Sequence, residues 1–215
     1  MIEALAIGGA FNPPTKAHIE LAEYAMHSLG LDAVVFIPSK MSYVIGEQGK
    51  NFSFTDEERY EMLQRIATSR RWMHICPYEL ECADQPRSYD TLCYLRENGC
   101  HARLLFGSDK LTELEHGWRH VEDICREFGI VCMTRSHDDI EKTIAEDPYL
   151  HSLSTYITPI AAPEKYQDIS STKVRELYLN IKNGGMQEEL LQELRGMLPK
   201  ELDGLKEWIT KCSVI

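Results

Sequence analysis

The sequence has no long apolar run and no paired cysteine motif. None of its apolar stretches approaches the ~20 residues that span a membrane. Residues 1–5 carry neither a basic region nor a long apolar run, so we expect no signal or transit peptide. The seven cysteines are scattered, and no two of them form a Cys-x-x-Cys pair, so a zinc site or redox motif is not indicated. These features predict a cytoplasmic protein in a reducing compartment, with no membrane partner.

Basic residues are scarce relative to acidic ones. The chain has 23 Lys and Arg against 34 Asp and Glu, which gives a formal net charge of −11. Such a charge argues against a protein that mainly coats nucleic acid or anionic membranes, although it is compatible with a local basic pocket. The 215 residues, 43% of them hydrophobic, suffice for one globular domain of moderate size.

The most informative stretch is residues 8–18, which read Gly-Gly-Ala-Phe-Asn-Pro-Pro-Thr-Lys-Ala-His. Gly8 and Gly9 have no side chain, so the backbone can turn tightly and lie against a ligand. Thr15 and His18 are three residues apart and share one face of the helix that begins here. Free N–H groups and the helix dipole favour phosphate at this end. The alternative is a strand–turn–helix junction whose glycines only make the turn.

This stretch resembles the first signature of the nucleotidyltransferases related to class I aminoacyl-tRNA synthetases. Its form, Gly-x-Phe-Asn-Pro-Pro-Thr-x-x-His, is similar to that of the nicotinamide or nicotinate mononucleotide adenylyltransferases. Those enzymes join a pyridine mononucleotide to the AMP part of ATP and release pyrophosphate. The resemblance implies that His18 binds ATP phosphates and supports the transition state, with Thr15 replacing the first histidine of the commoner His-x-x-His form. It also implies ATP contacts from Gly8, Gly9, Phe11 and Thr15, and mononucleotide contacts from Ala10, Phe11 and Asn12.

A second motif, residues 169–175, reads Ile-Ser-Ser-Thr-Lys-Val-Arg. Consecutive hydroxyls at a helix start either cap its N–H groups or donate to phosphate oxygens. Arg175, one turn into the helix, can form a forked pair with the β- or γ-phosphate. The motif resembles the family's Ile-Ser-Ser-Thr-x-x-Arg signature. That resemblance implies that Ser170, Ser171, Thr172 and Arg175 bind ATP and that Arg175 acts with His18 in catalysis.

Gly107, Asp109 and Trp118 follow an apolar run between the two motifs. By itself, Asp109 could be only a helix N-cap, and a lone tryptophan is more often part of a core. The spacing resembles the family's Gly-Ala-Asp…Trp pattern. This resemblance implies that Gly107 and Asp109 contact the nucleotide and that Trp118 stacks on the pyridine ring.

Residues 88–92 resemble the family's Ser-Tyr-x-x-Asp-Thr-Leu segment with two residues missing. The family places an aromatic side chain near the pyridine ring there. Tyr89 is the candidate for that role, and Thr91 is a second candidate for mononucleotide binding. A purely structural tyrosine is the alternative.

Three basic residues are further candidates. The family places a phosphate-binding lysine in the polar segment that corresponds to residues 39–53, which we expect to form a loop. Lys40 and Lys50 both fit, and we take Lys40 as the mononucleotide-binding candidate. Arg135 follows a predicted strand and could face phosphate or mononucleotide, with a surface ion pair as the alternative.

Apolar runs alternate with helical stripes along the chain and predict a Rossmann-like, three-layer α/β/α fold with a mainly parallel sheet. We expect residues 1–183 to form the nucleotidyltransferase domain and the helices of residues 184–215 to pack on the same domain. The expected strands are residues 4–7, 33–37, 72–76, 103–106, 130–133 and 155–160. Three expected helices cover residues 15–29, 186–198 and 201–211. Four more are expected to begin near residues 55, 88, 121 and 170.

The sequence thus predicts an enzyme whose partners are ATP and a pyridine mononucleotide. The 5′-phosphate of the mononucleotide is already anionic, so its attack on the α-phosphorus needs no general base. We expect Mg²⁺ to be held mainly by the ATP phosphates and water, without protein metal ligands. The alternatives are another adenylyl- or cytidylyltransferase of the superfamily, or a non-catalytic nucleotide-binding protein. The choice between nicotinate and nicotinamide stays open, and the C-terminal helices could support a homo-oligomer.

Overall fold

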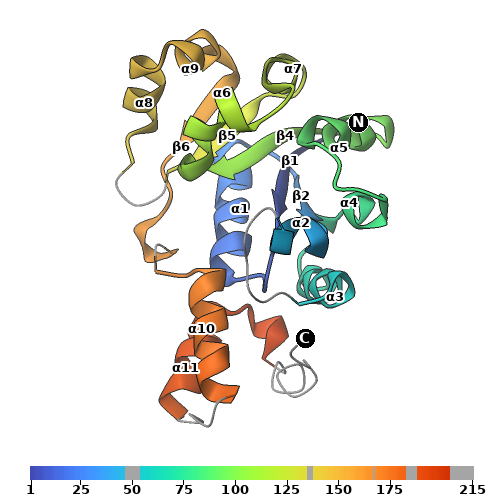
Figure 1. Cartoon of the computed structure of the whole chain (residues 1–215), viewed down its shortest axis with the longest axis vertical. Helices are drawn as coiled ribbons and strands as arrows, with labels where there is room; N and C mark the ends of the chain where they lie inside the picture. Colours follow the sequence, from blue (N-terminus) through green and yellow to red (C-terminus); the bar gives the residue numbers. More distant parts are fainter. Residues whose placement is uncertain (47–53, 135–137, 167, 183–187, 204–215) are drawn as a thin grey trace.

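Six parallel strands form a single sheet in the order β3-β2-β1-β4-β5-β6 (Figure 1). The structure is a computed structural model and describes residues 1–46, 54–134, 138–166, 168–182 and 188–203. The strands are β1 (Ile2–Gly9), β2 (Ala33–Pro38), β3 (Met73–Ile75), β4 (Cys100–Gly107), β5 (Ile130–Met133) and β6 (Ile157–Ile160). The predicted Rossmann-like α/β fold is confirmed.

Helices cover both faces of the sheet. They are α1 (Lys16–Ser28), α2 (Met41–Gly46), α3 (Asp56–Ala67), α4 (Tyr78–Glu81), α5 (Ser88–Glu97), α6 (Leu114–Gly117), α7 (Val121–Glu127), α8 (Ile140–Glu146), α9 (Pro148–Ser152), α10 (Ser171–Lys182) and α11 (Glu188–Met197). Short 3₁₀ helices are η1 (Ser108–Glu113), η2 (Ser154–Tyr156), η3 (Glu164–Tyr166) and η4 (Lys200–Leu202).

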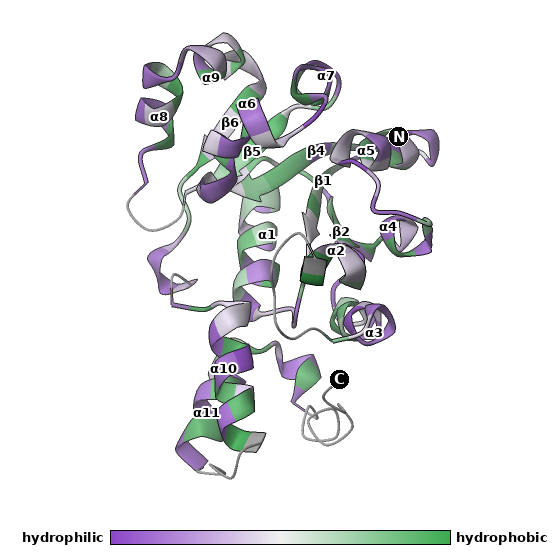
Figure 2. Cartoon of the chain, viewed as in Figure 1, coloured by the Kyte–Doolittle hydropathy of each residue, from purple (hydrophilic) through white to green (hydrophobic). Residues whose placement is uncertain are grey.

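Alternate residues of the strands belong to two hydrophobic cores. Leu5 of β1 packs in one core with α1, α3, α10 and α11, whereas Ala4 and Ala6 pack in the other with α5 to α9. Because both faces are covered, a central strand such as β2 is buried at all six of its residues. Figure 2 shows both hydrophobic and hydrophilic residues on helices such as α3 and α11, as expected for helices with one buried face.

The position of β1 determines where a ligand can bind. The chain passes from β1 through α1 to β2 on one side, and β4 pairs with β1 on the other side. The strand order therefore reverses between β1 and β4. Ligands of open α/β sheets bind in the crevice at the carboxyl ends of the strands at such a point. The motif of residues 8–18 begins at the carboxyl end of β1.

Four local expectations differ from the structure. The segment of residues 39–53 is not all loop, because α2 forms there with Val44 buried. The last strand starts at Ile157 rather than residue 155, since η2 precedes it. Helices α8 and α9 lie between β5 and β6, a stretch for which we predict neither a strand nor a helix. Of the predicted helix 201–211, the described part, up to Asp203, is η4 and a turn, and the rest lies outside the described residues.

Candidate functional site

The turn after β1 is buried from Ala10 to Thr15. Phe11 has a positive φ of 43°, a left-handed conformation that is uncommon for a residue with a side chain. Gly9 lies beneath the Phe11 ring, and a Cβ at that position would be 3.4 Å from the ring. A Cβ at Gly8 would meet no protein atom within 4 Å. A Cβ at Gly9 would thus make only an ordinary contact with the ring, and the open space at Gly8 keeps the exposed backbone accessible to a ligand.

The His18 ring is held by the capping of α1. Thr15 is the N-cap, and its Oγ1 accepts from the backbone N–H of His18 at 3.5 Å. In return, the backbone N–H of Thr15 donates to Nδ1 of His18 at 3.1 Å, and Thr15 Oγ1 lies 2.8 Å from the same nitrogen. This is a capping box in which histidine takes the place of the usual Glu or Gln.

These contacts also assign the tautomer of His18. A backbone N–H can only donate, so Nδ1 must accept, and the proton of the neutral ring is on Nε2. The edge of Phe11 packs against the ring, with centroids 5.3 Å apart and planes at 72°. The ring is therefore held on two sides and carries its proton on Nε2, and an N–H donor suits an anionic oxygen.

The second motif contacts the first directly, although more than 150 residues separate them. Arg175 donates from Nη1 to the backbone oxygen of Asn12 at 2.8 Å, and Ser171 donates from Oγ to that of Pro13 at 2.8 Å. Arg175 also donates from Nη2 to Thr172 Oγ1 at 3.1 Å. Burial lowers the pKa of Arg175 below its usual value, but an arginine stays cationic at neutral pH. The fold therefore brings a guanidinium to the turn that leads to His18.

Ser170 has a structural role in this arrangement. Its Oγ accepts from the backbone N–H of Lys173 at 3.2 Å, at the start of α10. Ser170 therefore caps an N–H group of the helix, one of the two roles that the sequence left open for these hydroxyls. The contact occupies Ser170 Oγ as an acceptor, and the hydroxyl proton can still be donated to an anion.

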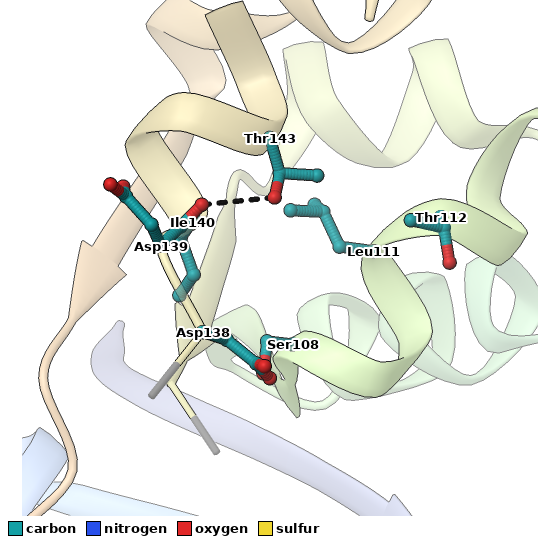
Figure 3. Close-up of a pocket in the computed structure, with 7 residues that line it drawn as sticks. All are labelled: Ser108, Leu111, Thr112, Asp138, Asp139, Ile140 and Thr143. Carbon is teal, nitrogen blue, oxygen red and sulfur yellow. Dashed lines mark hydrogen bonds between the residues drawn. The ribbon is translucent and has the colours of Figure 1, made fainter. Parts of the chain in front are cut away.

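Gly107, Asp109 and Trp118 lie at the carboxyl end of β4, next to β1. Gly107 ends the strand, and Asp109 is exposed in η1. The half-buried Trp118 packs on Phe106 with ring centroids 5.6 Å apart. A pocket of about 210 Å³ opens between η1 and the start of α8 (Figure 3). On its wall, Ser108 donates to Asp138 at 2.5 Å.

Three other candidates are engaged with the protein rather than gathered around His18. Lys40 donates from Nζ to the backbone oxygens of Leu80, at 2.8 Å, and Cys82. The hydroxyl of Tyr89 donates to Glu127 at 2.8 Å, and its ring stacks on His120. Thr91 is buried and donates to Glu79 at 3.0 Å. Lys50 and Arg135 lie outside the described residues.

Sequence reasoning missed two buried charged residues near this edge. Glu79 accepts from Thr91 and from Gln85, whose Oε1 in turn accepts from the backbone N–H of Lys40. Burial raises the pKa of Glu79, and its hydrogen bonds partly offset that shift. Arg59 is fully buried and donates to the backbone oxygen of Ala10 in the first motif. Its spacing could have indicated the burial of Arg59, because Met62 and Leu63 follow it by three and four residues and therefore share its face of α3.

The first motif contains no carboxylate side chain. Its capping side chains at the start of α1 are a hydroxyl, Thr15, and an imidazole, His18, and an O–H or N–H group suits a phosphate oxygen. Among the residues that the structure describes, no group of three or more His, Cys, Asp or Glu side chains could hold a metal ion. This set of side chains fits a Mg²⁺ ion that arrives bound to a nucleotide.

Within the described ranges of the chain, no helix is both long enough and apolar enough to cross a membrane.

Comparison with known sequences gives a family match over most of the chain. Residues 6–177 match the model of the cytidylyltransferase-like family. A protein of Clostridium kluyveri named "probable nicotinate-nucleotide adenylyltransferase" is 30% identical over 194 residues, which cover 85% of this chain and 90% of the relative. A protein of Listeria welshimeri with the same name is 29% identical over 174 residues, covering 79% and 82%.

Solved structures also resemble this chain. The nicotinic acid mononucleotide adenylyltransferase of Plasmodium falciparum, complexed with NaAD, superposes with a TM-score of 0.70. The match covers 97% of this chain and 96% of that one at 16% sequence identity. A second structure of that protein, complexed with APC, gives the same values. At this identity the likeness demonstrates a shared fold.

Proposed function

Because this chain belongs to the cytidylyltransferase-like family, we propose that it is a nucleotidyltransferase that transfers the adenylyl group of ATP to a pyridine mononucleotide. Pyrophosphate is the second product, and the reaction makes a dinucleotide of NAD biosynthesis. The observation that carries the proposal is the docking of Arg175 and Ser171 onto the turn that leads to Thr15 and His18. The relatives named for nicotinate support nicotinate mononucleotide as the preferred acceptor.

In this mechanism the protein positions two anions and stabilises charge. The 5′-phosphate of the mononucleotide attacks the α-phosphorus of ATP in line, and the bond to the β-phosphate breaks. His18 donates from Nε2 to an oxygen on which charge develops, and Arg175 binds the β- or γ-phosphate. Gly8 and Gly9 let the chain lie against the phosphates. Ser170 and Thr172 donate hydroxyl protons at the start of α10, whereas the hydroxyl of Ser171 holds the carbonyl of Pro13.

Magnesium enters as part of the ATP substrate. The first motif has no carboxylate, so the triphosphate oxygens and water would supply the ligands of the ion. When bound, the ion neutralises charge that builds on the leaving pyrophosphate. The chain's own contribution is the geometry of Thr15, His18 and Arg175 around the triphosphate.

The proposal is tested with purified protein, ATP, Mg²⁺ and each pyridine mononucleotide in turn. We expect dinucleotide and pyrophosphate to form in equal amounts, faster with nicotinate than with nicotinamide mononucleotide. Chromatography of the nucleotide products measures both acceptors directly. If another phosphorylated acceptor reacts and neither pyridine mononucleotide does, the chain is a different transferase of the family. ATP binding without turnover on any acceptor would mark a non-catalytic nucleotide-binding protein.

We expect the substitution Trp118→Ala to weaken binding of the mononucleotide by about 1–3 kcal/mol and to leave ATP binding nearly unchanged. The reason is that Trp118 packs on Phe106 at the carboxyl end of β4, where we place the acceptor. Titration of each substrate separately measures the difference. The matched control is Trp72→Ala, since Trp72 packs on Phe36 and precedes β3, which β2 and β1 separate from β4. Equal weakening of both substrates in Trp118→Ala would show that this tryptophan only supports the core.

A further inference from the structure

Arg59 in the first turn of α3 is the most completely buried charged side chain among the described residues, with 0% of its surface exposed. It donates from Nη1 to the backbone oxygen of Ala10 at 2.6 Å and from Nη2 to that of Ser39 at 2.6 Å. Its Nε donates to the backbone oxygen of Phe54 at 3.3 Å, and its charge is paired with Asp56 at 2.5 Å. The proposed mechanism gives this guanidinium no role.

These contacts join three separate segments at the carboxyl edge of the sheet. Ala10 lies in the turn after β1, and Ser39 is the residue that follows β2. Phe54 precedes α3, and its backbone N–H donates to the buried Oδ1 of Asn12 at 3.0 Å. Two hydrogen bonds therefore connect the start of α3 to the first motif, one from Arg59 and one to Asn12.

An apolar side chain at position 59 would avoid the desolvation free energy that a buried guanidinium costs. Burying a guanidinium costs several kcal/mol that its partners must offset, and this cost lowers the pKa of Arg59 while Asp56 opposes the shift. The neighbours of Arg59 on the inner face of α3 are Met62, Leu63 and Ile66. An apolar residue could not donate to the oxygens of two turns at once, whereas the guanidinium fork can.

We propose that Arg59 is a positioning residue for adenylyl transfer, which rests on the function proposed above. By holding the carbonyl of Ala10, it fixes the turn in which the next residue, Phe11, takes its left-handed conformation. The Phe11 ring packs on His18, and the backbone oxygen of the following Asn12 accepts from Arg175. Arg59 thereby sets the relative placement of the two groups that act on the triphosphate.

The test compares Arg59→Met and Arg59→Lys with Leu63→Ala, at a temperature where each variant is folded. Displacing catalytic groups by about 1 Å can cost up to about 100-fold in rate, so we expect Arg59→Met to lower kcat between about tenfold and 100-fold. The KM for the mononucleotide should change little. A lysine keeps the charge and can donate to one turn, so Arg59→Lys should recover part of kcat. Leu63 is fully buried one turn further along α3, and Leu63→Ala should lower the melting temperature with kcat unchanged.

The role is refuted if folded Arg59→Met or Arg59→Lys keeps the wild-type kcat, or if Leu63→Ala loses kcat as strongly at equal loss of melting temperature. If Arg59→Met does not fold, Arg59→Lys alone decides: a reduced kcat per folded molecule supports the role, and an unchanged kcat overturns it. Rates are measured on whichever acceptor the wild-type protein uses. Failure of the pyridine-mononucleotide proposal would therefore appear in the wild type, and failure of the Arg59 proposal only in the comparison of variants.

Discussion

Replacing His18 with alanine is expected to lower kcat by about 10²–10³-fold, the range for removing one preorganised donor to developing charge. The structure gives a reason to expect an effect on kcat rather than on substrate binding. The backbone N–H of Thr15 occupies Nδ1, so the ring presents Nε2–H in a fixed direction. A donor aimed at the oxygen between the α- and β-phosphates binds the transition state more strongly than it binds ATP.

Steady-state kinetics measures this difference, because KM for ATP should stay within a small factor of the wild-type value. The matched control is His27→Ala, since His27 is exposed in the last turn of the same helix. That variant should keep the wild-type kcat. A His18→Ala enzyme with an unchanged kcat and a raised KM for ATP would instead show that His18 binds only the ground state.

Local patterns were sufficient to predict the elements that carry the first motif. Thr15 begins α1 because a hydroxyl there satisfies free N–H groups, and the observed helix, Lys16–Ser28, lies within the predicted residues 15–29. The apolar runs became the parallel strands because only Val-, Ile- and Leu-rich segments can be buried on both faces. The capping box of Thr15 and His18 joins residues only three apart, so it too could be predicted from the sequence.

Contacts between distant segments could not be predicted in the same way. Periodicity places Arg59 on the inner face of α3, but it does not indicate that the carbonyls of Ala10 and Ser39 lie opposite. The contacts of Lys40 depend on where α4 ends, because the carbonyls of Leu80 and Cys82 become available there. Helix α2 is six residues long with weak patterning, and the burial of Val44 favours it only in the folded protein.

In the proposed mechanism, the meeting of the two motifs gives the triphosphate two helix starts in fixed positions. Helices α1 and α10 both begin at this edge, and each directs the positive end of its dipole towards it. Arg175 and Ser171 donate to Asn12 and Pro13, so the two helix starts hold a fixed separation. Because the N-termini of α1 and α10 are already fixed, the protein does not have to rearrange when negative charge moves from one phosphate to the next.

The substitution Arg175→Lys tests this arrangement, and we expect it to lower kcat/KM for ATP by about 10²-fold or more. A guanidinium has five N–H groups in a rigid fork, and the contacts with Asn12 and Thr172 engage two of them. An ammonium cannot keep both contacts and also bind a phosphate in forked geometry, although it keeps the charge. The control is Lys173→Ala, because Lys173 lies on α10 like Arg175 and its ammonium pairs with Glu193 of α11. This variant should leave kcat/KM unchanged. If Arg175→Lys keeps the wild-type kcat/KM, charge alone suffices, and the forked contact proposed for Arg175 is wrong.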